Sequence, residues 1–267
     1  RCTAHELASL GATVVLMGRR EEKLQEVVAE IEADSKESGS QGKADYRVAD
    51  IRDEERVIEA IADIVSQHGG IHALVNNAGG QFPSKVEDIS KNGFQTVVEN
   101  NLVGGFVMAR EVYKATMKEH GGNVVNITAD CNNGFPGMAH TGAARAGMEN
   151  FTKTAAWEWG RYGVRVNAVA PGWIASSGMD NYPAHMKSWI RSLADAVPIK
   201  RMGTESEVSS AICFLLSPGA AFISGDCLRI DGAASQGGRV WPMPKAKNNE
   251  PYNGFHRAVT PKVLSDD

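Results

Sequence analysis

Two asparagines followed by small residues form the most informative pattern in this chain. Asn76 and Asn77 end a short apolar run and precede Ala78, Gly79 and Gly80. Such a run is typical of a buried parallel strand whose loop comes close to a ligand. Asparagine amides can bind backbone groups or sugar hydroxyls, and large side chains would block a flat ring. Because ligands lie beyond the carboxyl ends of strands in open parallel sheets, this run predicts a binding site.

The elements that must position this run alternate between strand and helix. The predicted strands are Thr13–Met17 (buried), Tyr46–Ala49, 72–76, Asn123–Ile127 and Val164–Val169. The predicted helices are Arg1–Leu10, Glu21–Ser35, Asp53–His68, Gly93–Glu119, Ala139–Gly160, Met179–Leu193 (a lid) and Ser206–Leu216, with a surface loop at Lys36–Lys43. This alternation predicts the α/β class, with a single doubly wound, Rossmann-type parallel sheet and helices on both faces.

Length and composition limit the classes of protein to which the chain can belong. Its 267 residues suit one large α/β domain, and 42% of them are hydrophobic. A net charge of −4 argues against a nucleic-acid partner. No apolar run is long enough to cross a membrane, and the four scattered cysteines show no metal-ligand spacing. We therefore expect no nucleic acid, membrane or metal partner, and a cytoplasmic location.

Four motifs in consistent order resemble the short-chain dehydrogenases/reductases. They are Asp50-Ile51, Asn76-Asn77-Ala78-Gly79, Pro171-Gly172-Trp173-Ile174-Ala175-Ser176, and Phe222-Ile223-Ser224-Gly225 with Ile230-Asp231-Gly232. The resemblance implies an NADP-binding domain over residues 1–233 and a C-terminal extension over 234–267. The extension is polar and rich in proline, which leaves open whether it packs on a neighbouring subunit, covers the site or is loose.

The resemblance also implies which residues hold the cofactor. Asp50 would accept from the adenine amino group and Ile51 would pack on its ring. The residues expected at the adenosine ribose are Asn77, Ala78 and Gly79, and those at the nicotinamide and phosphates are Pro171, Gly172, Trp173, Ile174 and Ser176. An ordinary turn after a strand is the alternative for Pro171 and Gly172.

Two arginines after the first apolar strand predict the type of dinucleotide. Arg19 and Arg20 stand where a carboxylate would bind the ribose 2′-hydroxyl of NAD. Guanidinium groups pair instead with a 2′-phosphate, so we expect NADP(H) with Arg19 or Arg20 at that phosphate. A solvated charge pair at the start of a helix is the alternative.

The tyrosine and lysine that most of the resembled family uses are replaced here. In the YxxxK motif the lysine lowers the pKa of the tyrosine, which then exchanges a proton with a carbonyl oxygen. Thr141 and Arg145 occupy these two places, and no tyrosine of the chain has a lysine four residues later. Asn101 matches the asparagine that the family carries on a helix.

These replacements favour one kind of chemistry. Threonine is a poor acid and arginine keeps its proton, so a proton relay to a ketone is missing. Reduction of an enoyl thioester demands less, because fixed donors can stabilise the enolate charge. We expect Asn101 and Thr141 to donate to that oxygen, while Arg145 holds the nicotinamide ribose. Substrate contacts are predicted for the two residues Thr128 and His140, and Asp130 is a further candidate base.

Three segments are similar to peroxisomal trans-2-enoyl-CoA reductases, whose 2,4-dienoyl-CoA reductase relatives also lack the usual tyrosine. The three segments of this chain are Gly79–Phe82, Gly134–Pro136 and His140–Gly147. The first hypothesis is therefore an NADPH-dependent reductase of small-molecule enoyl- or dienoyl-CoA thioesters. An alcohol or ketone oxidoreductase with an unconventional proton relay and a catalytically inactive NADP-binding subunit are the alternatives.

Further expectations concern the assembly of subunits and the start of the chain. Pairing of the long helices implies a homo-oligomer, a dimer or tetramer, and the aromatic group Phe151, Trp157 and Trp159 would pack in the core or between subunits. A strand and a glycine-rich loop precede the first helix in the family. Since both are absent from this chain, we expect it to be an N-terminally truncated form of a longer protein.

Overall fold

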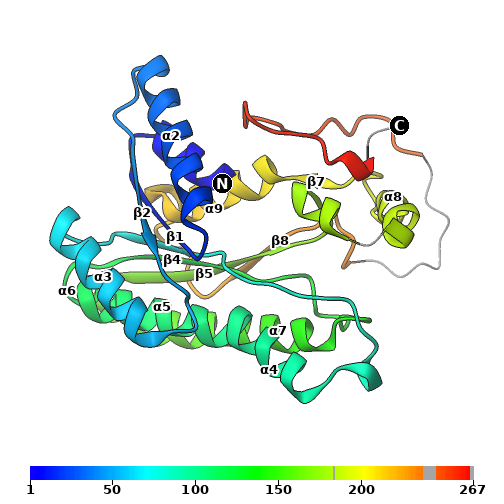
Figure 1. Cartoon of the computed structure of the whole chain (residues 1–267), viewed down its shortest axis with the longest axis horizontal. Helices are drawn as coiled ribbons and strands as arrows, with labels where there is room; N and C mark the ends of the chain where they lie inside the picture. Colours follow the sequence, from blue (N-terminus) through cyan, green and yellow to red (C-terminus); the bar gives the residue numbers. More distant parts are fainter. Residues whose placement is uncertain (183, 237–244, 265–267) are drawn as a thin grey trace.

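Parallel strands form the centre of the fold (Figure 1). The computed structural model describes residues 1–182, 184–236 and 245–264. The main sheet has the order β3-β4-β5-β8 and consists of β3 (Ala73–Asn76), β4 (Gly122–Ile127), β5 (Val164–Pro171) and β8 (Cys227–Ile230). All three pairings are parallel, so the strands end at the same edge.

A second parallel ladder joins β1 (Thr13–Gly18) to β2 (Lys43–Val48). The strand predicted at Thr13–Met17 exists, but the prediction that it is buried is wrong, because Thr13 is exposed and the rest is half-buried. Within the described residues, β1 has a hydrogen-bonded neighbour on one side only. The backbone groups along the other edge of β1 therefore have no strand partner within the described residues.

Helices cover both faces of the main sheet. Neighbouring β4 residues point to opposite faces, so Val124 packs with α3, α5 and α7, whereas Val125 packs with α9. The helices are α1 (Cys2–Ser9), α2 (Glu21–Ser38), α3 (Glu54–His68), α4 (Lys91–Val98), α5 (Gly104–Val112), α6 (Lys118–His120), α7 (Ala139–Trp159), α8 (Lys187–Ala196) and α9 (Glu205–Leu216). This arrangement confirms the predicted α/β class with helices on both faces.

Some predicted boundaries are wrong by a few residues. The helix expected at Glu21–Ser35 continues to Ser38 and ends at Gly39, whose φ of 73° is left-handed. The strand expected at Tyr46 begins at Lys43, which pairs with Thr13. The predicted surface loop between them is correspondingly shorter.

The predicted helix Gly93–Glu119 is one helical column of several pieces. Two π-helical stretches, η2 (Glu99–Val103) and η3 (Tyr113–Met117), separate α4, α5 and α6. Single π-helical turns inside α-helices often occur at functional sites. The first of them carries Asn101, one of the predicted site residues.

The described part of the C-terminal extension packs against its own chain. Thr204 donates to the Tyr252 carbonyl at 2.7 Å, and Val263 is buried beside Ile190 and Leu193 of α8. The option that this part is loose is therefore wrong. The expected lid at Met179–Leu193 comprises η5 (Ser177–Asn181), η6 (Ala184–Met186) and most of α8, with residue 183 outside the described residues.

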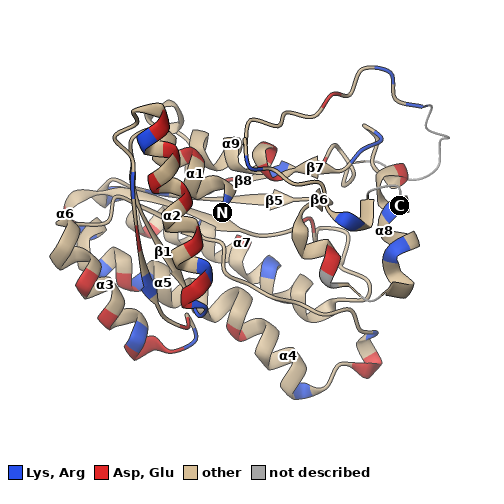
Figure 2. Ribbon diagram, turned by 45° about the horizontal axis from the view of Figure 1, so that its top comes forward, with Lys and Arg blue, Asp and Glu red and all other residues tan. Residues whose placement is uncertain are grey.

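Charges of both signs mix along the helical surface (Figure 2). On α2 and α3, for example, Lys23 pairs with Glu26 and Arg56 pairs with Glu59. No helix in the described ranges is both long and apolar enough to cross a membrane.

Two asparagine amides and a threonine hydroxyl tie four elements together below the site. Asn76 of β3 donates to the Gly105 carbonyl at 3.0 Å and to Asn126 of β4 at 2.9 Å. Asn126 in turn donates to the Thr152 hydroxyl of α7 at 2.9 Å, and Thr152 donates to the Met148 carbonyl. Each buried polar group thus has a partner, which fixes the ends of β3 and β4 against the helices.

The amide chain predicts the effect of one substitution. Thr152→Val leaves an N–H of Asn126 buried without an acceptor, so the free energy of unfolding should fall by about 1–3 kcal/mol. Thr154→Val, on the exposed side of the same helix, should change it by less than about 0.5 kcal/mol. Urea denaturation of both variants measures the difference, and equal stability of the two would contradict the structural role of the chain.

Candidate active site

Three loops meet at the carboxyl edge of the main sheet. Residues 77–80 follow β3, 128–131 follow β4 and 172–176 follow β5, and these strands are hydrogen-bonded neighbours. The stretch from Asn77 to Gly80 is exposed. The structure therefore brings the main predicted motifs to one open edge.

Asn101 holds the first of these loops in place. Its Nδ2 donates to the Gly80 carbonyl at 2.6 Å and to the Val97 carbonyl at 2.8 Å, and its Oδ1 accepts from the Gly80 N–H at 3.3 Å. The side chain is buried. Both of its N–H groups are used by backbone carbonyls, so in this arrangement Asn101 positions the loop.

Arg145 places a positive charge next to the same loop. Its Nη1 donates to the Ile127 carbonyl at the end of β4 at 2.5 Å. No carboxylate of the described residues lies within ion-pair distance of its guanidinium, and burial lowers the pKa of Arg145 to about 10. Arg145 therefore stays cationic at neutral pH but lacks an anionic partner, a costly state that a bound anion would relieve.

Gly79 lies directly against both side chains. A Cβ built on Gly79 would lie 2.5 Å from Asn101 Oδ1 and 2.6 Å from Arg145 Nη2. The same atom on Gly80 would meet nothing closer than 3.8 Å. Only the first of the two glycines is therefore required by the packing of the site.

His140 and Thr141 begin α7 and are fully buried. The Thr141 N–H donates to His140 Nδ1 at 2.8 Å, and the Thr141 hydroxyl lies 3.2 Å from the same atom. Burial lowers the pKa of His140, which favours the neutral ring, and the Thr141 N–H at Nδ1 favours the tautomer with its proton on Nε2. That nitrogen is buried and has no hydrogen-bond partner among the described residues, while Phe82 packs edge-on against the ring.

Thr128 and Asp130 follow β4 but differ in their surroundings. The Thr128 hydroxyl donates to the Val169 carbonyl at 3.0 Å, so it faces the sheet. Asp130 Oδ1 is buried without a hydrogen-bond partner in the described part of the chain. Burial and the nearby Asp231 raise the pKa of Asp130. Substrate contact by Thr128 and proton transfer by Asp130 stay predictions.

Asp50 has a partner that the motif did not reveal. Arg52 donates to its carboxylate through the backbone N–H at 3.1 Å and through Nε at 3.0 Å. The Arg52 hydrogen bonds lower the pKa of Asp50 to about 2. Ile51 packs against Gly104, where a Cβ would lie only 2.6 Å from its Cδ1. In the sequence, only the short separation of Asp50 and Arg52 could have indicated that these two side chains form an ion pair.

Arg19 and Arg20 lie just beyond the end of β1. Both are exposed, and neither guanidinium forms a hydrogen bond or ion pair within the described residues. The Arg19 charge is near enough to Asp50 to help lower the pKa of that carboxyl. Of these two cations, Arg19 therefore lies near the residue predicted to hold adenine.

The loop after β5 is fixed by its backbone. Gly172 donates to the Ile230 carbonyl at 3.0 Å, and the Trp173 carbonyl accepts from Gly203 at 2.9 Å. Ile174 then pairs with Gly203 in the short parallel ladder of β6 (Ile174–Ala175) and β7 (Gly203–Thr204). These bonds place Trp173, Ile174 and Ser176 after the carboxyl end of β5.

The arrangement fits a nicotinamide dinucleotide. The loop at Gly79 is open, and its packing leaves no room for a side chain. Unpaired guanidinium groups at Arg145, Arg19 and Arg20 would donate hydrogen bonds to sugar oxygens and would neutralise the charge of phosphates.

Comparison with known sequences decides the family. A family profile described as "Enoyl-(Acyl carrier protein) reductase" matches residues 1–235. The chain belongs to the short-chain dehydrogenases/reductases.

As a short-chain dehydrogenase/reductase, the chain has relatives of several kinds. It is 32% identical over 235 residues to a "Probable 2,4-dienoyl-CoA reductase [(2E)-enoyl-CoA-producing]" of Bacillus subtilis, covering 87% of this chain and 90% of the relative. A solved "citronellol catabolism dehydrogenase (AtuB)" of Pseudomonas aeruginosa is 55% identical, with a TM-score of 0.77 and coverage of 88% and 89%. A solved actinorhodin polyketide ketoreductase variant with NADPH is 30% identical, with a TM-score of 0.81 and coverage of 88% and 92%. The family and oxidoreductase class are thus shown, whereas the substrate differs among relatives.

The contacts of Gly79 predict a matched pair of effects. Gly79→Ala would press a methyl group against the clamped Asn101, so the free energy of unfolding should fall by about 1–3 kcal/mol. The affinity for NADPH should fall as the loop shifts. Gly80→Ala is the control and should leave both quantities near those of the parent. Denaturation and fluorescence titration with NADPH measure them, and equal behaviour of the variants would refute this packing.

Proposed function

We propose that this protein is an NADPH-dependent reductase of enoyl- or dienoyl-CoA thioesters. The observation that carries the proposal is Arg145, a cation without an anionic partner at the edge where the three loops meet. It stands in the YxxxK motif at the position of lysine, while threonine replaces the tyrosine. Such a site can stabilise a developing negative charge but has no phenol to protonate a ketone oxygen.

Each residue of the candidate site would have a separate role in this reduction. When bound, the cofactor would supply the hydride, so the task left to this chain would be to stabilise the enolate charge on the thioester oxygen. Arg145 would hold the nicotinamide ribose and would add positive potential at that oxygen. Asn101 holds the loop at Gly80 in position through its hydrogen bond to the Gly80 carbonyl. Protonation of the enolate carbon comes from water or from a nearby acid, for which His140 Nε2–H and Asp130 are the candidates.

We propose NADP(H) as the cofactor because of the two free guanidinium groups after β1. Asp50, Ile51, Asn77, Ala78 and Gly79 would contact the adenosine, and the residues from Pro171 to Ser176 the nicotinamide side. The solved relative with NADPH supports a phosphorylated cofactor in this family.

A dehydrogenase acting on an alcohol is the second candidate. The 55% identical relative that is named for citronellol catabolism favours it. It would need a proton path other than the tyrosine of the motif. An inactive NADP-binding subunit is the third candidate.

We also propose a homo-oligomer in the cytoplasm. Phe151 and Trp159 pack against the core, but the indole of Trp157 is 89% exposed, so the option that it belongs to the core is wrong. An exposed tryptophan on a long helix is suited to a contact with a second subunit.

One assay separates the three candidates. The full chain is incubated with NADPH and crotonyl-CoA, a 2,4-dienoyl-CoA or a ketone panel, and in the reverse direction with NADP⁺ and citronellol. Turnover of the thioesters supports the proposal. Turnover of ketones or citronellol alone indicates the second candidate, and NADPH binding without turnover indicates the third.

Arg145 variants then test the role of the cation in the same assay. Arg145→Met removes the charge and should lower kcat by about 10²–10³-fold. Arg145→Lys keeps a charge and should retain much more activity than the Met variant. NADPH affinity, measured separately, distinguishes loss of binding from loss of catalysis. Equal kcat in the Met variant and the parent would remove Arg145 from the mechanism.

The double variant Arg19→Ala/Arg20→Ala tests the choice of cofactor. Loss of a charge-assisted bond to the 2′-phosphate should weaken NADPH by about ten- to hundredfold and NADH far less. Arg56→Ala, which removes an exposed cation from α3, is the control. Titration with both cofactors measures the ratio, and an equal loss for NADPH and NADH would exclude the phosphate contact.

A further inference from the structure

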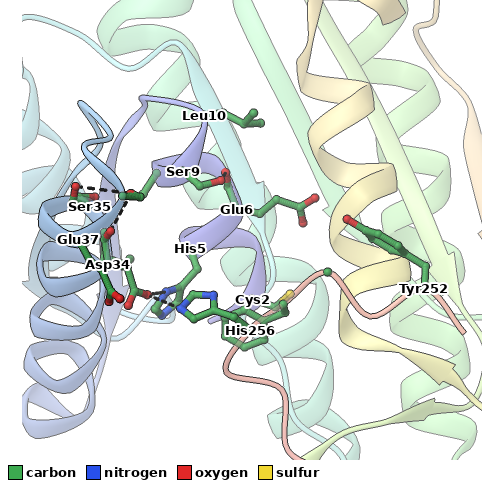
Figure 3. A pocket seen from close by; sticks show the side chains of 15 residues that line it. Cys2, His5, Glu6, Ser9, Leu10, Asp34, Ser35, Glu37, Tyr252 and His256 are labelled. Carbon is green, nitrogen blue, oxygen red and sulfur yellow. Dashed lines mark hydrogen bonds and ion pairs between the residues drawn. The ribbon is translucent and has the colours of Figure 1, made fainter.

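A pocket of about 620 Å³ lies away from the three loops, between α1, α2 and the C-terminal segment. Figure 3 shows the side chains of His5, Asp34 and His256 turned toward one another in this pocket. None of its lining residues belongs to the loops of the candidate active site. The three side chains come from parts of the sequence that are far apart.

The ring of His5 is held between two carboxylates. Its Nδ1 lies 3.0 Å from Asp34 Oδ2, and its Nε2 lies 3.1 Å from Glu30 Oε2. His256 Nε2 lies 2.9 Å from the same Asp34 oxygen. The ligand atoms of His5, Asp34 and His256 all lie within 4.8 Å of one another, which no other group of three His, Cys, Asp or Glu does in the part of the chain that is described.

A neutral His5 cannot satisfy both contacts. Only one ring nitrogen of a neutral imidazole carries a proton, so the other presents a lone pair to a carboxylate oxygen. His5 is 5% exposed, so water screens this unfavourable contact poorly. A cation between Nδ1 and Asp34 would remove the repulsion while Nε2–H donates to Glu30.

We propose that His5, Asp34 and His256 bind one divalent transition-metal ion of the Zn²⁺ class. Two imidazoles and a carboxylate are a preferred donor set for this class, and a water molecule in the pocket would be the fourth ligand. Glu30 would orient His5 from the outer side, as carboxylates commonly do for metal-binding histidines.

The ion would fasten the C-terminal segment to the N-terminal helices. Phe255 is buried next to His5, with ring centroids 5.1 Å apart, and its N–H donates to Ser206 at 3.1 Å. These contacts hold His256 over Asp34. Arg257 also donates to Asp34, through Nη2 to Oδ1 at 2.5 Å and through Nε to Oδ2 at 3.0 Å. In the metal-bound form Arg257 keeps its bond to Oδ1, and the ion replaces both the histidine contacts and the Arg257 Nε contact at Oδ2.

The test uses the purified full chain, stripped with a chelator and titrated with Zn²⁺ alone. Calorimetry and elemental analysis should show one ion per chain, with a rise in Tm. His256→Gln should abolish binding, and Glu30→Gln should weaken it by about tenfold or more. The control His120→Gln, an exposed residue outside the pocket, should bind as the parent does.

Two results would overturn the proposal. One is less than a tenth of an equivalent of Zn²⁺ bound by the folded parent chain. The other is unchanged binding in His256→Gln, whose circular dichroism shows whether it folds. Hydrogen exchange gives a readout that does not depend on enzymatic activity, because Zn²⁺ should slow exchange around residues 253–257 only if the ion joins that segment to α1 and α2.

Discussion

The parallel ladder of β3, β4 and β5 is the constraint on which the candidate site depends. Because the three strands run in one direction and are joined in register, their carboxyl ends cannot separate. The amides of Asn76 and Asn126 reinforce that alignment inside the sheet, and Thr152 connects it to α7. A shift of any one strand would break bonds that are buried and cannot be replaced by water. The loops contain candidate binding and catalytic residues, and the ladder of strands holds these loops in position.

The ladder also explains the position of the unpaired guanidinium of Arg145. Arg145 is drawn inward by its bond to the Ile127 carbonyl, the last residue of β4. Gly79 lets the guanidinium approach the neighbouring loop, and Asn101 holds that loop through the Gly80 carbonyl. Helix, strand and loop each contribute one contact, so the position of the charge is set by the fold. A cation held in this manner needs little reorganisation when an anionic ligand binds.

Much of this arrangement could be predicted from the sequence, because it follows from local patterns. Alternating strands and helices predicted the parallel sheet, and the run from Asn76 to Gly79 predicted the open edge. Burial of β1 was not predictable from its own apolar residues, since burial depends on which strands lie beside it. The orientation of His140 and the clamping of Asn101 depend on side-chain packing. The grouping of His5, Asp34 and His256 has no sequence signal, because the spacings of 29 and 222 residues reflect tertiary contacts alone.

The indole of Trp173 lies edge-to-face with that of Trp189, with ring centroids 5.4 Å apart and planes at 89°. One ring belongs to the loop after β5 and the other to α8, so the pair spans the junction between the sheet edge and the helix that borders it. Electronic transitions of two indoles this close are coupled, and the coupling changes steeply with their separation and angle. Near-ultraviolet ellipticity is therefore an intrinsic reporter of the position of α8, with no dye or spin probe attached.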